Sequence, residues 1–163
     1  MLAGAPQILI ALEQSGLGAA IRQSAWAYPA ANVGHILALT LFAGGVVAMD
    51  ARLLGAFAAA PPASVVRPAR RIAMLGLALM AVTGFVLFTA EASHVAMNPV
   101  FQIKALLITL GLVNAIAVGW TLGSALDATP AHAPLPGRIR LAAAVSLLLW
   151  VAVAACGRLI AYF

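Results

Sequence analysis

Of the 163 residues, 64% are hydrophobic and only 8% are charged, and the mean hydropathy is +1.08. A soluble globular domain has roughly 45–50% apolar and about 25% charged residues, so this composition excludes that class and predicts an integral membrane protein. The net charge is +5, but the arginines stand in short segments beside apolar runs, where they report topology. We therefore expect a lipid bilayer and no nucleic acid as a partner.

The first 25 residues predict an amphipathic segment at the outer membrane face. Apolar and polar side chains fall on different sides of a short helix that begins after Pro6. The segment has no basic start, and its apolar stretch ends at Glu13, so it makes a poor signal peptide. We divide the chain into this segment, residues 1–25, and a membrane bundle, residues 26–163.

Four apolar runs follow, and each is long enough for the roughly 20 residues that a spanning helix needs. The separators PPASVVRPARR, EASHVAMNP and DATPAHAPLPGR all contain proline, which is typical of the connections between helices. The sequence therefore predicts an all-α integral membrane four-helix bundle with a short N-terminal interfacial helix. The expected spans are about 28–50, 72–91, 100–123 and 139–163.

The nine basic residues are divided unequally between the two sides of the predicted bundle. Six belong to the first and third connections and three to the other side, so the positive-inside rule places those connections in the cytoplasm and both termini outside. The six are Arg52, Arg67, Arg70, Arg71, Arg138 and Arg140, and the three are Arg22, Lys104 and Arg158.

Polar residues gather in one layer in the outer half of the bundle. His35 lies about 10 Å below the outer end of the first helix, if that helix begins near Tyr28, and Lys104 lies about 7 Å inside the third. Arg158 is one to two turns from the end of the fourth helix, and His94 follows the second. These four residues are the candidate site, and we expect His35, Lys104 and Arg158 to face one another.

Each of these residues also has a structural interpretation. A lysine or arginine near a helix end can extend its charge to the headgroups, which applies to Lys104 and Arg158. His35 is too deep and too short for that, but an intramembrane histidine can donate a structural hydrogen bond to a neighbouring helix. His94 and His132 can be solvated loop residues.

For three other residues we expect structural roles. Asp50 and Arg52, at the inner end of the first helix, indicate a cap or an ion pair that anchors the loop. The single cysteine, Cys156, lies inside the last apolar run without a second thiol, so we expect it to fill space between helices.

With these residues in view, the chain resembles an uncharacterised family of small four-helix bacterial inner-membrane proteins. The resemblance covers nearly the whole chain and implies a fold and a location in the bacterial inner membrane, but no activity. The matching pieces are SAWAYP, His35, GG followed by DARLLG, NPVFQIK and GRLIAYF.

More remotely, the chain is similar to HemJ-type membrane protoporphyrinogen oxidases and to CopD-type copper-resistance proteins. The shared features are a first-helix histidine followed by Arg-Leu, and a lysine that opens a later helix. In the HemJ type the corresponding histidine and lysine are associated with b-type haem and porphyrin chemistry. This resemblance implies such roles for His35 and Lys104.

The function that these features favour is a membrane-embedded b-type haem protein for electron transfer or redox chemistry. His35 would be the axial ligand, with Lys104 and Arg158 at the propionates. The second axial position stays open between His94, a methionine (Met97 or Met80) and five-coordinate iron. An enzyme of this kind would be a haem-dependent membrane oxidoreductase, with a quinone or a periplasmic redox partner.

Two functions of other classes compete with the haem protein. One is a non-catalytic accessory subunit of a larger membrane complex or homo-oligomer, which contacts lipid or quinone. The other is a transporter of copper or a small anion that uses the same outer layer. Copper sites usually cluster Met, Cys or His, whereas the five methionines here are dispersed.

Overall fold

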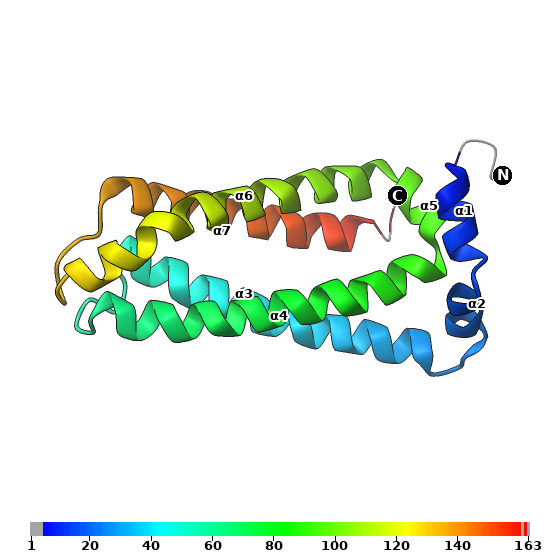
Figure 1. The fold of residues 1–163 in the computed structure, drawn as a ribbon, viewed down its shortest axis with the longest axis horizontal. Helices are drawn as coiled ribbons and strands as arrows, with labels where there is room; N and C mark the ends of the chain where they lie inside the picture. The colour runs from blue at the N-terminus through cyan, green and yellow to red at the C-terminus, as the bar shows by residue number, and fades with distance from the viewer. Residues whose placement is uncertain (1–4, 161, 163) are drawn as a thin grey trace.

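The computed structural model describes residues 5–160 and 162 and contains four long helices that run along one axis (Figure 1). Each of the four is long and apolar enough to cross a membrane, and no strand occurs in these described residues. The predicted all-α membrane bundle is confirmed. The long helices are α3 (Ala27–Leu54), α4 (Pro62–Ala90), α6 (Pro99–Ala128) and α7 (Gly137–Leu159).

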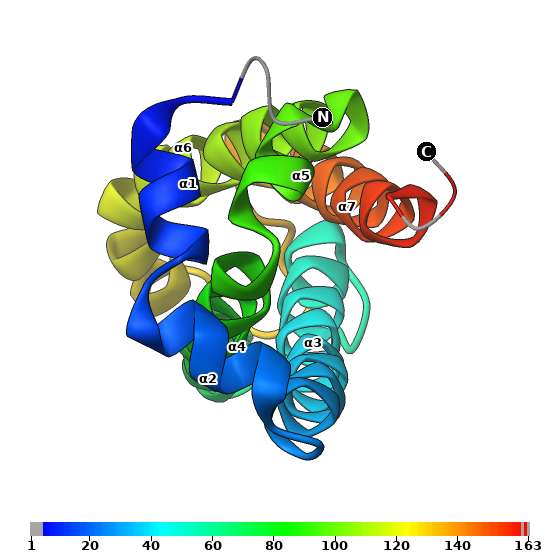
Figure 2. The same cartoon turned by 90° about the vertical axis from the view of Figure 1, so that its right-hand side faces the viewer.

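The two ends of the bundle differ in what closes them (Figures 1 and 2). At one end, called the loop end here, lie the connections 55–61 and 129–136. At the other, the terminal end, three short helices lie across the long ones. They are α1 (Gln7–Glu13), α2 (Gly16–Gln23) and α5 (Ala92–Met97).

Two separators are more helical than the sequence predicted. Helix α4 begins at Pro62 and not near residue 72, because a proline in the first turn gives up an amide that has no helical partner anyway. Pro68 lies inside α4, where it removes one helical hydrogen bond without ending the helix. Part of the second separator forms α5, and Asn98 then caps α6 by accepting a 2.8 Å hydrogen bond from the amide of Val100.

Helices α3 and α4 form the closest pair in the bundle because glycines remove side chains from their contact. A Cβ added to Gly45 would stand 2.6 Å from the backbone nitrogen of Ala73. A Cβ added to Gly76 would stand 2.5 Å from that of Phe42. In lipid, such small residues let backbones approach and gain van der Waals contact.

Two hydrophobic clusters fill the bundle. The middle one contains Phe42, Val46 and Ala73, and Trp150 of α7 meets Phe42 edge-on with ring centroids 4.6 Å apart. This contact joins α7 to the α3–α4 pair. The cluster nearer the loop end consists of Leu53, Val66, Leu122, Leu126, Leu135, Ile139 and Ala143.

Large apolar side chains also cover the outside of the bundle. Leu148 is 73% exposed and Trp120 is 84% exposed. In water such a surface would be costly, whereas lipid is the solvent that suits it. The chain is therefore a multi-pass membrane protein whose outer faces contact lipid.

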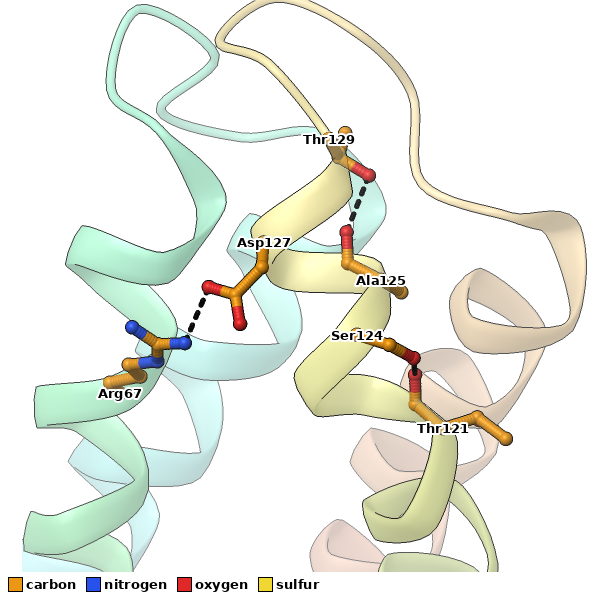
Figure 3. Close-up of polar contacts among 6 residues, drawn as sticks. All are labelled: Arg67, Thr121, Ser124, Ala125, Asp127 and Thr129. Atoms are coloured by element: carbon orange, nitrogen blue, oxygen red, sulfur yellow. Dashed lines mark hydrogen bonds and ion pairs between the residues drawn. The ribbon is translucent and has the colours of Figure 1, made fainter.

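One ion pair connects α4 with α6 at the loop end (Figure 3). The Arg67 guanidinium lies 2.6 Å from an Asp127 carboxylate oxygen, and it is the one ion pair among the described residues. More than half of each side chain is exposed, at 54% and 62%. A pair this exposed contributes roughly 0–1 kcal/mol, so it adds little to stability.

Specific polar contacts hold the N-terminal segment against the terminal end of the bundle. The Glu13 carboxylate accepts hydrogen bonds from the Ser93 amide, at 2.9 Å, and from the Ser93 hydroxyl. Arg22 donates a 2.9 Å hydrogen bond to the carbonyl of Ala90, the last residue of α4. The amphipathic segment therefore covers the helix ends of α4 and α5.

Candidate functional site

His35 makes a hydrogen bond across the α3–α4 contact. Its Nδ1 lies 2.8 Å from the hydroxyl oxygen of Thr83 on α4. That hydroxyl already donates its own proton to the carbonyl of Leu79, at 2.7 Å. When the hydroxyl donates to Leu79, the shared bond has its proton on Nδ1, and the lone pair of Nε2 is available to a ligand.

Glycine makes room for the imidazole between the two helices. The ring carbon Cε1 stands 3.2 Å from the point where a Cβ on Gly84 would be. On α3, Gly34 comes directly before His35, and the Thr83 methyl group lies 3.4 Å from the point where a Cβ on Gly34 would be. The half-buried ring is thus held by a hydrogen bond on one side and by close backbone on another.

Lys104 approaches the same layer from the other side of the bundle. It is half-buried on α6, and its Nζ lies 3.5 Å from the position of a Cβ on Gly157 of α7. Cys156 is the residue before this glycine on α7. His35, at the α3–α4 contact, and Lys104, at the α6–α7 contact, therefore lie at similar depths in the terminal half of the bundle, and no hydrogen bond joins them among the described residues.

Arg158 takes a different place from the one expected. Its guanidinium donates a 2.5 Å hydrogen bond to the hydroxyl of Tyr162 and stands 4.7 Å from the centre of that ring. The side chain is exposed, because the tyrosine one turn further along offers it a partner at the surface. Arg158 therefore does not join His35 and Lys104 in the interior.

The residues considered for the second axial position are scattered. His94 and Met97 are exposed on α5, a short helix where the sequence predicted a loop. Met80 is partly buried against the middle cluster of Phe42 and its neighbours. No group of three or more His, Cys, Asp or Glu side chains within the described part of the chain could hold a metal ion.

Sequence reasoning missed Thr83, the hydrogen-bond partner of His35. Its signal was weak but present: VTGF is a hydroxyl next to a glycine in the middle of an apolar span. A histidine inside the membrane needs such a partner, and threonine with glycine is what permits close contact between two helices.

Asp50 and Arg52 also differ from the expectation, because they form no ion pair. Residues two apart on a helix point to different sides, and the side chains find different surroundings. Arg52 does anchor the loop, by a 2.9 Å hydrogen bond to the Ala60 carbonyl. Both residues are buried, at 1% and 2% exposure, and Asp50 Oδ2 and Arg52 Nε have no partner among the described residues.

Four spanning helices with a histidine and a lysine in one layer define a small multi-pass α-helical membrane protein. Residues 13–163 match a family of unknown function, DUF6644, and the chain belongs to that family. The matched region contains His35, Lys104 and Arg158 and begins at Glu13, the residue that ties the N-terminal segment to α5. The comparisons with curated proteins and with solved structures gave no match.

Proposed function

We propose that this protein binds a b-type haem in the membrane and that His35 is its axial ligand. The observation that carries the proposal is the hydrogen bond between Nδ1 of the half-buried His35 and Thr83, which would leave Nε2 as a lone pair when Nδ1 is the donor. Histidines that ligate metals almost always donate their other N–H in this way, which fixes the ring and raises the basicity of the ligating nitrogen.

The residues around His35 meet only part of what a bound haem needs. His35 supplies a neutral imidazole, the usual axial ligand, and Lys104 supplies a half-buried cation that would neutralise a propionate. Arg158 would have to leave Tyr162 before it could hold the second propionate. Bound haem would supply one-electron redox chemistry, while the chain would orient the ring through Thr83 and keep water away with the apolar faces of α3 and α4.

The finer localisation is also a proposal. Six arginines belong to the loop end and three basic residues to the terminal end. The positive-inside rule then favours a bacterial inner membrane with the loop end in the cytoplasm and both termini in the periplasm. In that orientation the layer that contains His35 and Lys104, here called the histidine layer, would exchange electrons with a quinone or with a periplasmic redox partner.

A hemin titration of purified protein in mild detergent tests the ligand directly. The unmodified chain should give a Soret band that saturates at one haem per chain. His35→Ala should lose that band, because the only imidazole in the layer is gone. His132→Ala should keep it, since His132 belongs to the 129–136 connection at the opposite end.

The same titration can contradict the proposal. If His35→Ala binds hemin as tightly as the unmodified chain, His35 is not the ligand. If the folded, unmodified chain gains no Soret band, the His35–Thr83 bond serves the contact between α3 and α4 only. The function as a non-catalytic accessory subunit would then be better supported than haem binding.

A further inference from the structure

At the loop end, far from the histidine layer, two connections and two helix ends enclose a cavity of about 190 Å³. The amide of His132 donates a 2.8 Å hydrogen bond to the carbonyl of Ala58, which ties the 129–136 connection to the 55–61 connection. Leu135 is buried in the cluster beneath and gives the cavity a packed wall. The cavity is therefore built from fixed parts of the fold.

The ionisable side chains that line this cavity are all basic. Its lining includes Arg52, Arg140 and His132, and it includes no acidic side chain among the described residues. Of the nearby carboxylates, Asp127 is paired with Arg67, and Asp50 does not line the cavity. Two guanidinium groups with no carboxylate between them attract an anion.

Arg52 carries the strongest indication of a ligand. The residue is 2% exposed, one terminal nitrogen is held by the Ala60 carbonyl at 2.9 Å, and Nε has no partner among the described residues. A buried charge without a counter-ion is costly, and Arg52 forms no ion pair among the described residues. An anion in the cavity would supply a counter-charge to this guanidinium.

We propose that this cavity binds a phosphate group through Arg52 and Arg140, with His132 at its mouth. A tetrahedral oxyanion accepts hydrogen bonds from several directions, which suits donors on two helices and a loop. The group can belong to a free phosphate or to the headgroup of an anionic phospholipid, since the cavity lies at the end of the spanning helices. This inference is independent of haem.

The test uses the full chain in a neutral detergent and two probes. Inorganic phosphate is titrated by calorimetry, and binding of phosphatidylglycerol is compared with that of phosphatidylcholine by native mass spectrometry. Arg140→Ala should weaken binding of the responsible probe at least about tenfold, because it removes a hydrogen bond to a charged group. Arg138→Ala is the matched control. Arg138 carries the same charge two residues before Arg140, but its side chain does not line the cavity.

Each outcome decides the proposal. Phosphate binding that depends on Arg140 and not on Arg138 supports a soluble ligand. Phosphatidylglycerol binding with the same dependence, and no phosphate binding, supports a lipid headgroup. Binding of neither probe, or an equal loss in both variants, overturns the site. Arg140 is exposed on the first turns of α7, so its removal leaves the core intact.

Discussion

A single hydroxyl proton decides what His35 can do. When Thr83 donates to Leu79, the imidazole donates to Thr83, and only then is Nε2 left as a lone pair. Had the threonine proton pointed at the ring, Nε2 would carry a proton and could not ligate. The chemistry of the layer therefore depends on a bond within α4 as much as on the histidine.

Thr83→Val, which keeps the shape and removes the hydroxyl, should weaken haem binding by about 10–100-fold, the usual effect of losing the hydrogen-bond partner of a ligand. Thr83→Ser should restore most of the affinity because it returns the acceptor. Hemin titration measures both variants. An unchanged affinity in Thr83→Val would mean that this hydroxyl does not position the ligand.

At the scale of elements, close contact between α3 and α4 brings Thr83 within reach of His35, and glycine permits that contact. Gly45→Ala should destabilise the protein by about 1–3 kcal/mol, because the new methyl group would meet the backbone of Ala73 and Ala69 at 2.6 and 2.7 Å. Gly44→Ala, on the adjacent open position, has nothing within 4 Å and should leave stability equal or higher. Thermal unfolding in detergent compares the two, and equal losses would contradict the packing described.

The contact of the N-terminal helices with the terminal end should depend on pH through Glu13. Hydrogen bonds from the Ser93 side chain, and then from its amide, lower the pKa of this carboxyl from its ordinary value of 4.5. A lowered pKa means that the stabilisation is complete above that ordinary value and is lost as the pH falls through the lowered one.

Hydrogen exchange, corrected for the intrinsic effect of pH, should therefore show α1 and α2 becoming less protected as the pH falls below 4.5, the ordinary pKa of this carboxyl. Glu13→Gln should be less protected at neutral pH and should lose that pH dependence. The neighbouring Glu91→Gln, at an exposed carboxyl, should retain it. Protection in the unmodified chain that stays constant down to pH 3 would show that Glu13 does not hold the segment.

For the whole molecule, the distribution of arginines predicts how the bundle sits in the membrane. A reporter fusion at Pro61, in the first connection of the loop end, should behave as cytoplasmic, and one after residue 97 should behave as periplasmic. The reverse pattern would place the histidine layer on the cytoplasmic side. The redox partner would then have to be sought there.

The sequence predicts the four spans well because their length and apolarity are properties of single segments. It also predicts that His35 and Lys104 share a layer, because depth follows from counting residues along a helix. It does not predict which way a side chain turns. Arg158 is at the expected depth, yet Tyr162, four residues later, holds it at the surface.

Contacts between segments could not be predicted from the sequence either. Thr83 gains its role only when α4 is packed against α3, and Arg52 becomes a buried cation only in the folded bundle. The sequence predicts a connection at Pro62 and Pro68 because proline usually marks one. In the structure Pro62 is in the first turn of α4, and the buried side chains of Pro62, Val66 and Ala69 pack this stretch against the bundle.

The visible spectrum of the protein, purified in mild detergent from haem-sufficient cells, tests the central claim most directly. With one haem on His35, the oxidised protein should show a Soret band that shifts on addition of dithionite, and His35→Ala should lose it. A folded protein that is colourless before and after dithionite, and that stays so with added hemin, would contradict the claim and leave His35 as a structural hydrogen-bond donor to Thr83.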